Sequence, residues 1–376
     1  MKRMLTAMLC TAVLSGLGAL EITGTAPQFE LTDPSGIPTE VDIPVDTLNG
    51  EVSTLFNQAL DQINGQIANI DGTPEKVIKA FGNASVYSST GATLRNYAGY
   101  RLFGVALGAM FGAQLPYSIF EVIGNPDIGT EVMDKLEKEK DMVAGINAQG
   151  VNLQFGLNMS FLVKNLYLGV KAGYFPGNAF LSDNFKFTTW SFGVTASYQF
   201  FPKMNVLPIG LLVWRGLSVN SGVIYQGTAM GMEMPLDKVS INNGNFNLSI
   251  DPKAALDITV HTVTIPIEAV TSVRLLWILN LAVGLGIDVG FGSSKIAVSA
   301  TGDINADPQG AYSGYIRQSK AGSISLNAGG TEGPSIFHPK LMLGLGLSLG
   351  PVLIDIPITF YLNNGYSAGV TIGFTL

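Results

Sequence analysis

The chain has 376 residues, of which 13% are charged and 47% are hydrophobic, and its mean hydropathy is +0.33. Ordinary soluble domains are roughly one quarter charged, so a soluble protein of this composition would cover its surface poorly. The net charge of −7 argues against nucleic acid as a partner. Beyond residue 20 no run of about 18 uncharged apolar residues occurs, which argues against membrane-spanning helices.

Residues 1–20 are typical of an export signal. Lys2 and Arg3 give a positive start, residues 4–14 are apolar, and residues 16–20 are small or apolar. The only cysteine, Cys10, lies inside this segment and is interpreted as a hydrophobic filler rather than a lipid-attachment site. The remaining chain therefore has no disulfide framework and no thiol chemistry.

Residues 21–96 are predicted to form an N-terminal leader with a helical segment. After an irregular stretch rich in Pro, Thr and Asp, apolar residues recur at helical spacing from Val52 to Ile70. A second helix is predicted to start at Thr73-Pro74 and to stop at Gly82. We expect residues 48–82 to form a hatch that lies in the barrel or caps its periplasmic mouth, with a small periplasmic module as the alternative. The predicted hatch residues are Leu55, Phe56, Ile63, Ile67 and Phe81.

Residues 337–376 carry the clearest pattern, an alternation with a period of two. Large apolar residues such as Leu341, Leu343 and Leu345 alternate with small or polar residues such as Gly344 and Gly346. The small face carries almost no charge, which favours a transmembrane barrel with apolar groups toward lipid and small or polar groups toward the lumen. The last predicted strand, with Phe374 near its end, resembles the C-terminal signal read by the barrel-assembly machinery.

Residues 97–376 are therefore predicted to form an all-β transmembrane antiparallel barrel of about ten strands, with twelve to fourteen as the alternative. The same alternation begins near Tyr97, and two places are ambiguous: residues 205–213 could hide a further strand, and a phase change near His261 suggests a bulge. Predicted short connections at 163–165, 274–280 and 350–351 alternate with longer ones at 115–146, 176–185, 228–253 and 301–335. A charged helix is predicted around 131–143. An even strand count leaves both ends of the barrel on the periplasmic side, so the N-terminal helices are expected to stay there.

The inner face of the predicted strands carries a few isolated polar residues. They are interpreted either as a hydrogen-bonded lumen or as a selectivity lining, and they are Tyr167, Lys171, Asp288, Lys340 and Asp355. The chain has only two histidines, His261 and His338, and no paired-ligand spacing, so neither a metal site nor a cofactor is predicted. No serine and histidine share a strand face closely enough for a hydrolase, and no enzymatic activity is predicted.

Two segments resemble FadL-like outer-membrane barrels, in particular a divergent spirochaete branch that includes surface adhesin-like proteins. They are Ala80-Phe81-Gly82-Asn83-Ala84-Ser85-Val86-Tyr87-Ser88 before the first strand and Gly350-Pro-Val-Leu-Ile-Asp-Ile-Pro-Ile-Thr-Phe-Tyr-Leu-Asn-Asn-Gly-Tyr366 near the end. The resemblance implies an N-terminal hatch inside the barrel and the passage of hydrophobic substrates. The kinked strand and substrate residues of that family have no counterpart in this sequence.

Three functions follow from these observations. The first is uptake of small hydrophobic molecules through a plugged barrel in the bacterial outer membrane, where lipid is the main partner. The second is a non-transporting surface protein whose outer loops bind host or matrix molecules. An open hydrophilic pore is third, because few charged residues line the predicted interior.

Overall fold

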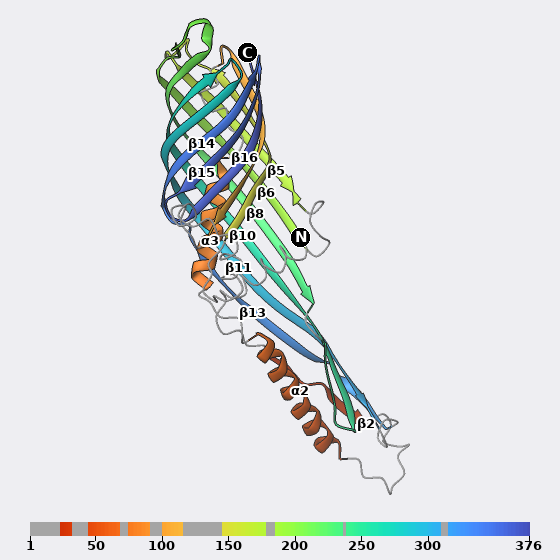
Figure 1. Cartoon of the computed structure of the whole chain (residues 1–376). Coiled ribbons are helices and arrows are strands. Elements are labelled where there is room, and N and C mark those ends of the chain that lie inside the picture. The colour runs from red at the N-terminus through yellow and green to blue at the C-terminus, as the bar shows by residue number, and fades with distance from the viewer. Residues whose placement is uncertain are drawn as a thin grey trace, which may run out of the picture.

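Figure 1 shows the computed structural model, an elongated molecule with a barrel at one end and a narrow arm at the other. It describes residues 23–31, 44–67, 74–90, 100–115, 145–177, 185–235, 238–309 and 315–376. The charged helix predicted at 131–143 lies outside these residues.

Ten antiparallel strands of the described chain close into a barrel, as predicted, because the last strand pairs with the first from Gly365↔Gln114 to Thr375↔Gly104. Closure leaves no open strand edge, which lipid would not tolerate. In barrel order the strands are β3 (Phe103–Gln114), β4 (Gly145–Asn158), β5 (Leu166–Pro176), β6 (Phe185–Phe201), β8 (Leu212–Pro235), β10 (Phe246–Leu275), β11 (Leu279–Pro308), β14 (Phe337–Leu349), β15 (Val352–Tyr361) and β16 (Gly365–Thr375).

The outer face of the barrel is apolar and the inner face is small or polar. On β14 the leucines at 341, 343, 345, 347 and 349 are all exposed, whereas the alternate positions are buried. Exposed leucines in such numbers mark a surface in contact with lipid rather than water. The alternation therefore places a membrane around this part of the molecule.

Neither helix of the described chain is long and apolar enough to cross a membrane.

Strands β10 and β11 are 30 residues long and continue past the barrel as an arm. In the arm β11 also pairs with β13 (Gly322–Glu332), and β13 pairs with β1 (Thr23–Thr25). On the other side β10 pairs with β9 (Val239–Asn242), and a separate two-stranded sheet joins β2 (Gln28–Leu31) to β12 (Ile316–Lys320). The predicted long loops at 228–253 and 301–335 are thus wrong in large part, because strands of the arm occupy much of both intervals.

Along β10 and β11 the buried positions keep the same parity, but their chemistry reverses. In the barrel part of β10 the buried residues are polar, such as Thr264 and Glu268, and the exposed residues are apolar, such as Ile267. In the arm the buried residues are apolar, such as Ile258, and the exposed residues are polar, such as Asp257. This reversal marks the height at which the sheet leaves lipid and enters water.

The bulge predicted near His261 is wrong, and the reversal explains the misread pattern. Both neighbours pair with His261 in unbroken register, as His261↔Ser293 and His261↔Gly227. The only register shift between β8 and β10 lies near the other end of the strand, between Thr271 and Val273. A ring stack of Trp190, Phe192 and Tyr225 lies at this height, and Tyr225 is bonded to His261, as expected for an interfacial aromatic belt.

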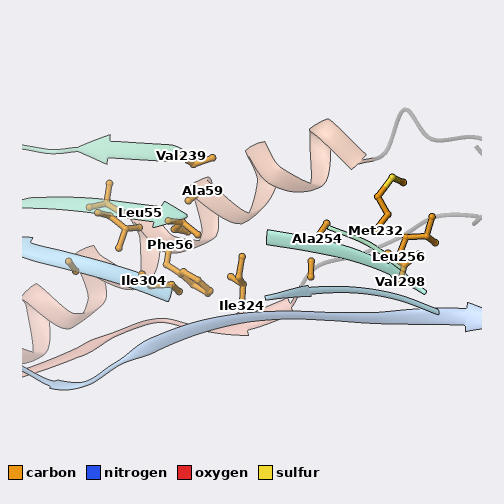
Figure 2. Packing of buried hydrophobic residues seen from close by; sticks show 14 of the residues in the cluster. Leu55, Phe56, Ala59, Met232, Val239, Ala254, Leu256, Val298, Ile304 and Ile324 are labelled. Atoms are coloured by element: carbon orange, nitrogen blue, oxygen red, sulfur yellow. The ribbon is translucent and has the colours of Figure 1, made fainter. Parts of the chain in front are cut away.

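Helix α2 (Val45–Ile67) covers the arm and gives it a hydrophobic core of its own. Its buried residues Leu48, Val52, Leu55, Phe56 and Ala59 pack with buried arm residues that include Ile304 and Ile324 (Figure 2). The arm is therefore built like a soluble α/β layer, with water-facing polar residues on its outer side.

Helix α3 (Pro74–Ser89) enters the barrel from the arm end, and the described residues up to 90 and from 100 onward contact the barrel wall at different heights. Asn83 lies near Gln114 at the arm end of β3, and Ser89 lies near Lys171 farther down. Tyr100 then contacts Tyr167, and Leu102 bonds to Leu376 at the opposite end. The expectation that the N-terminal helices stay at the end where Leu376 lies is wrong, because α2 packs on the arm and Asn83 of α3 bonds to Gln114 at the arm end of β3.

The end that holds Leu376 also holds the short turns, as predicted. The tight connections 276–278 and 350–351 lie there, and β14 and β15 pair down to Leu349↔Val352. Residues 205–213 hide no further barrel strand in the described chain. They hold the end of the short β7 (Met204–Asn205), a turn of 3-10 helix (Pro208–Gly210) and the start of β8.

Candidate functional site in the barrel lumen

The last two turns of α3 pack against two glycines of the barrel wall, Gly112 and Gly145, which we call the glycine seat. An added Cβ at Gly145 would lie 2.2 Å from the carbonyl carbon of Ala80, and one at Gly112 would lie 2.5 Å from the carbonyl oxygen of Ala84. Residues 80–90 are buried without exception, and most of them are Ala, Gly, Ser or Asn. Small residues on both sides allow the helix backbone to touch the barrel wall and close the mouth.

Tyr87 fixes this helix to the wall. Its hydroxyl donates to Gln114 Oε1 at 2.7 Å and lies 3.1 Å from Asn363 Oδ1, and its ring stacks on Tyr361 with centroids 4.0 Å apart. The backbone nitrogen of Ser335 also donates to Asn83 Oδ1 at 2.7 Å. The side chains of α3 therefore bond to Gln114 of β3, to Asn363 and to the backbone of Ser335, and the Tyr87 ring stacks on β15.

Next to α3 lies a buried group of charges. Lys340 Nζ is 2.7 Å from Glu268 Oε1 and 2.5 Å from Asp288 Oδ1, and the Tyr361 hydroxyl donates to Asp288 Oδ2 at 2.9 Å. Four separate strands, β10, β11, β14 and β15, supply these side chains. Charges that lie out of water are tolerated when they are paired and hydrogen-bonded in this way.

A second layer of hydrogen bonds joins α3 to the opposite wall. Gln226 donates to Ser88 Oγ at 2.9 Å and accepts from Gln149, and the hydroxyls of Ser85 and Thr262 are 2.8 Å apart. These residues are buried, so the layer fixes the helix and fills the upper lumen with protein.

All five predicted lumen residues point inward and are buried, but they do not meet at one site. Asp288 and Lys340 are in contact, Lys171 bonds to the backbone of Ser89, and Tyr167 packs on Tyr100 at the other end. Asp355 lies apart from these residues, beside Gly346 of the neighbouring strand. A Cβ added to Gly346 would lie 3.2 Å from Asp355 Oδ1.

The predicted hatch residues lie in two different parts of the molecule. Phe81 lies at the barrel mouth in α3, whereas Leu55 and Phe56 pack into the arm and not into the barrel. Ile63 and Ile67 lie in α2, and their side chains fall outside the described ones. The suggestion that the first helix caps the periplasmic mouth is wrong, because α2 needs the apolar face of the arm sheet to cover its stripe.

Glu268 and Tyr361 were missed by the sequence reasoning. Glu268 occupies an inward position of β10, where the presumed bulge obscured the phase, and Tyr361 ends β15. If the even-numbered positions of residues 246–275 are all taken as inward, with no change of phase, Glu268 is predicted to be an inward charge.

Among the described residues, the lumen holds no metal-binding group and the cavity beside Lys171 is small. No group of three or more His, Cys, Asp or Glu side chains within the described ranges could hold a metal ion. A cavity of about 50 Å³ lies between Thr90, Lys171 and Glu268. Ligand pockets usually measure about 300–1,000 Å³, so this cavity is large enough for water only.

A closed antiparallel barrel with an apolar outer belt and a polar lumen defines a transmembrane β-barrel protein of the bacterial outer-membrane type. The sequence matches the Lsa36-like family over residues 21–376, and the chain belongs to that family. Among curated proteins no sequence matches.

Several solved structures resemble parts of the molecule at low similarity. The Ralstonia pickettii toluene transporter TbuX shares 12% identity at a TM-score of 0.24, covering 80% of this chain and 99% of its own. The transport unit of the autotransporter AIDA-I from Escherichia coli shares 9% identity at a TM-score of 0.30, with 80% and 99% covered. The CymD monoaromatic hydrocarbon channel shares 10% identity at a TM-score of 0.25, with 80% and 97% covered. Likenesses this distant carry no argument about activity, and the relation to FadL-like barrels stays a prediction.

Proposed function

We propose that this protein is a non-transporting anchor that holds its arm outside the outer membrane, where the arm binds host or matrix macromolecules. The observation that carries the proposal is the reversal of chemistry along β10 and β11, which puts residues 246–260 and 293–308 beyond the lipid. A barrel that only conducted solutes would not need a water-facing layer with its own core.

The direction of the arm follows from the turns. Outer-membrane barrels have short periplasmic turns and longer outer loops. The tight turns at 276–278 and 350–351 lie at the end opposite the arm, so the arm extends to the cell exterior. Residues 23–31 and 44–67 are then also external, although they precede the first barrel strand.

Uptake of hydrophobic molecules through the lumen receives less support. Helix α3 occupies the outer mouth, two layers of hydrogen bonds hold it, and the cavity beneath it has a volume of about 50 Å³. Uptake would require α3 to leave its glycine seat during each transport event.

The test uses cells that display the full chain with Cys10→Ser and one added cysteine. Asn305→Cys lies on the exposed face of the arm, and Leu362→Cys lies on the tight outer turn of the barrel. Coupling a polyethylene glycol maleimide at position 305 should reduce binding to immobilised extracellular-matrix proteins, and coupling at position 362 should leave it unchanged. Equal binding after both couplings, or no binding by unmodified cells, would overturn the proposal.

A further inference from the structure

The lipid-facing wall of the barrel contains a concave apolar groove. Its volume is about 610 Å³, within the roughly 300–1,000 Å³ of small-molecule sites. It crosses five neighbouring strands, β4, β5, β6, β8 and β10. Its exposed apolar walls are Phe155, Leu157, Leu168, Val170, Val194 and Val223.

Two small outward residues form the floor of this groove. Ala196 of β6 and Ser221 of β8 are direct partners in the sheet, and larger residues stand above and below them. On β6 the floor lies two residues from Tyr198 and six from Trp190, within the membrane belt that these aromatic residues border. A concave site at this depth is surrounded by acyl chains.

The sheet beside the floor is interrupted. Pairing between β10 and β8 runs to Thr264↔Ile224 and resumes at Ile267↔Ser221, and the residues between include Pro266, which has no N–H to donate. Ile265 lines the outer groove, whereas Pro266 lines the small inner cavity beside Lys171 and Glu268.

Ser221 places a hydroxyl group in this apolar surrounding. No hydrogen bond of its side chain is present among the described residues, and its partner Ala196 offers only a methyl group. A hydroxyl without a partner in an apolar medium is unfavourable, so a ligand with an oxygen atom at this height gains a hydrogen bond that plain hydrocarbon does not.

We propose that the groove binds a single fatty-acyl chain of a membrane lipid and that Ser221 favours a chain that carries a hydroxyl group at the height of this residue. The walls supply apolar contact over the length of the chain, and Ala196 leaves the space that the chain occupies. The occupant comes from the membrane because the exposed apolar walls of the groove belong to the outer, lipid-facing side of the barrel. The site is separate from the arm, so it stands or falls independently of the proposed binding function.

Photolabelling of the full chain in phosphatidylcholine bilayers tests the proposal. A stearic acid that carries a diazirine on its chain should label peptides of β6 and β8 that contain Ala196 and Ser221. Among unlabelled hydroxystearic acids with the hydroxyl at different carbons, the one whose hydroxyl reaches Ser221 should compete better than stearic acid, by about five-fold for one neutral hydrogen bond. Ser221→Ala should remove this preference while labelling persists.

Ala196→Phe fills the groove and should abolish labelling at β6 and β8. Ala109→Phe is the matched control, because Ala109 is an exposed residue of β3 outside the groove. Both variants must show the heat-resistant folded band of the barrel, and Ser221→Leu replaces Ala196→Phe if the latter does not fold. Labelling spread evenly around the belt, or equal labelling of the position 196 and position 109 variants, would overturn the proposal.

Discussion

Lys340 Nζ on β14 donates a hydrogen bond of 2.5 Å to Asp288 Oδ1 on β11, although both side chains are buried inside the barrel. The pair lies between the wall and α3, with Glu268 as a second acceptor for the same ammonium group. Removing the lysine would leave two buried carboxylates facing each other without a cation.

Lys340→Met should therefore destabilise the barrel strongly. Loss of one partner from a buried ion pair costs roughly 3–5 kcal/mol, which urea unfolding in bilayers followed by gel shift can measure. Arg317→Ala is the control, because its 2.8 Å bridge to Glu30 is exposed. Such a surface pair contributes about 0–1 kcal/mol. Equal effects of the two substitutions would show that the buried cluster is not structural.

Gly145→Leu should expel α3 from the mouth. Even a Cβ at position 145 would overlap the backbone at Ala80, so a leucine cannot coexist with the seated helix. Planar-bilayer recordings should show a steady conductance that the unaltered protein lacks. Ala109→Leu, on the lipid side of β3, should produce no conductance. A silent Gly145→Leu barrel that still folds would mean that α3 is not what closes the lumen.

Phe56→Ala should unfold the arm locally and leave the barrel intact. Phe56 is buried in the arm core, where truncation of a phenylalanine costs about 3–5 kcal/mol. Proteolysis of α2 should become faster, whereas the heat resistance of the barrel band should not change. Asn57→Ala, at an exposed position of the same helix, should have no effect on either readout. If Phe56→Ala also lowered the heat resistance of the barrel band, the arm and the barrel would form one cooperative unit instead of two.

Lysine placed at two outward positions of β11 should distinguish lipid from water. Val283 is exposed in the barrel belt, and Ala297 faces outward in the arm. Val283→Lys should cost roughly 2–4 kcal/mol of folding free energy in bilayers, and Ala297→Lys should cost close to nothing. Similar costs at both positions would contradict the membrane boundary near Gly292.

The ten barrel strands could be predicted because lipid imposes a strict period of two, as in Leu341 to Leu349. The arm could not be predicted in this way. Its strands continue the same alternation, but their apolar residues lie at the inward, even-numbered positions and no longer at the outward, odd-numbered ones. Near His261 this change imitates a bulge, and the polar outer residues of 293–308 resemble a loop. The inward residues Asp288 and Lys340 were predicted from parity, but their pairing depends on a register between β11 and β14 that a single sequence does not encode.

The sequence alone also does not predict at which end of the barrel the N-terminal helices lie. Strand count fixes where the barrel begins and ends, but it does not show at which end α2 and α3 lie. Their position follows from contacts such as Asn83 with Gln114 and Tyr87 with Asn363, which join residues far apart in the chain.

Cysteine labelling of intact cells tests the external arm most directly. In a Cys10→Ser background, Asn305→Cys lies on the arm, and Lys203→Cys is exposed near the short-turn end. A membrane-impermeant maleimide should label position 305 on intact cells and position 203 only after the outer membrane is permeabilised. Labelling of position 203 but not of position 305 on intact cells would place the arm in the periplasm and contradict the account.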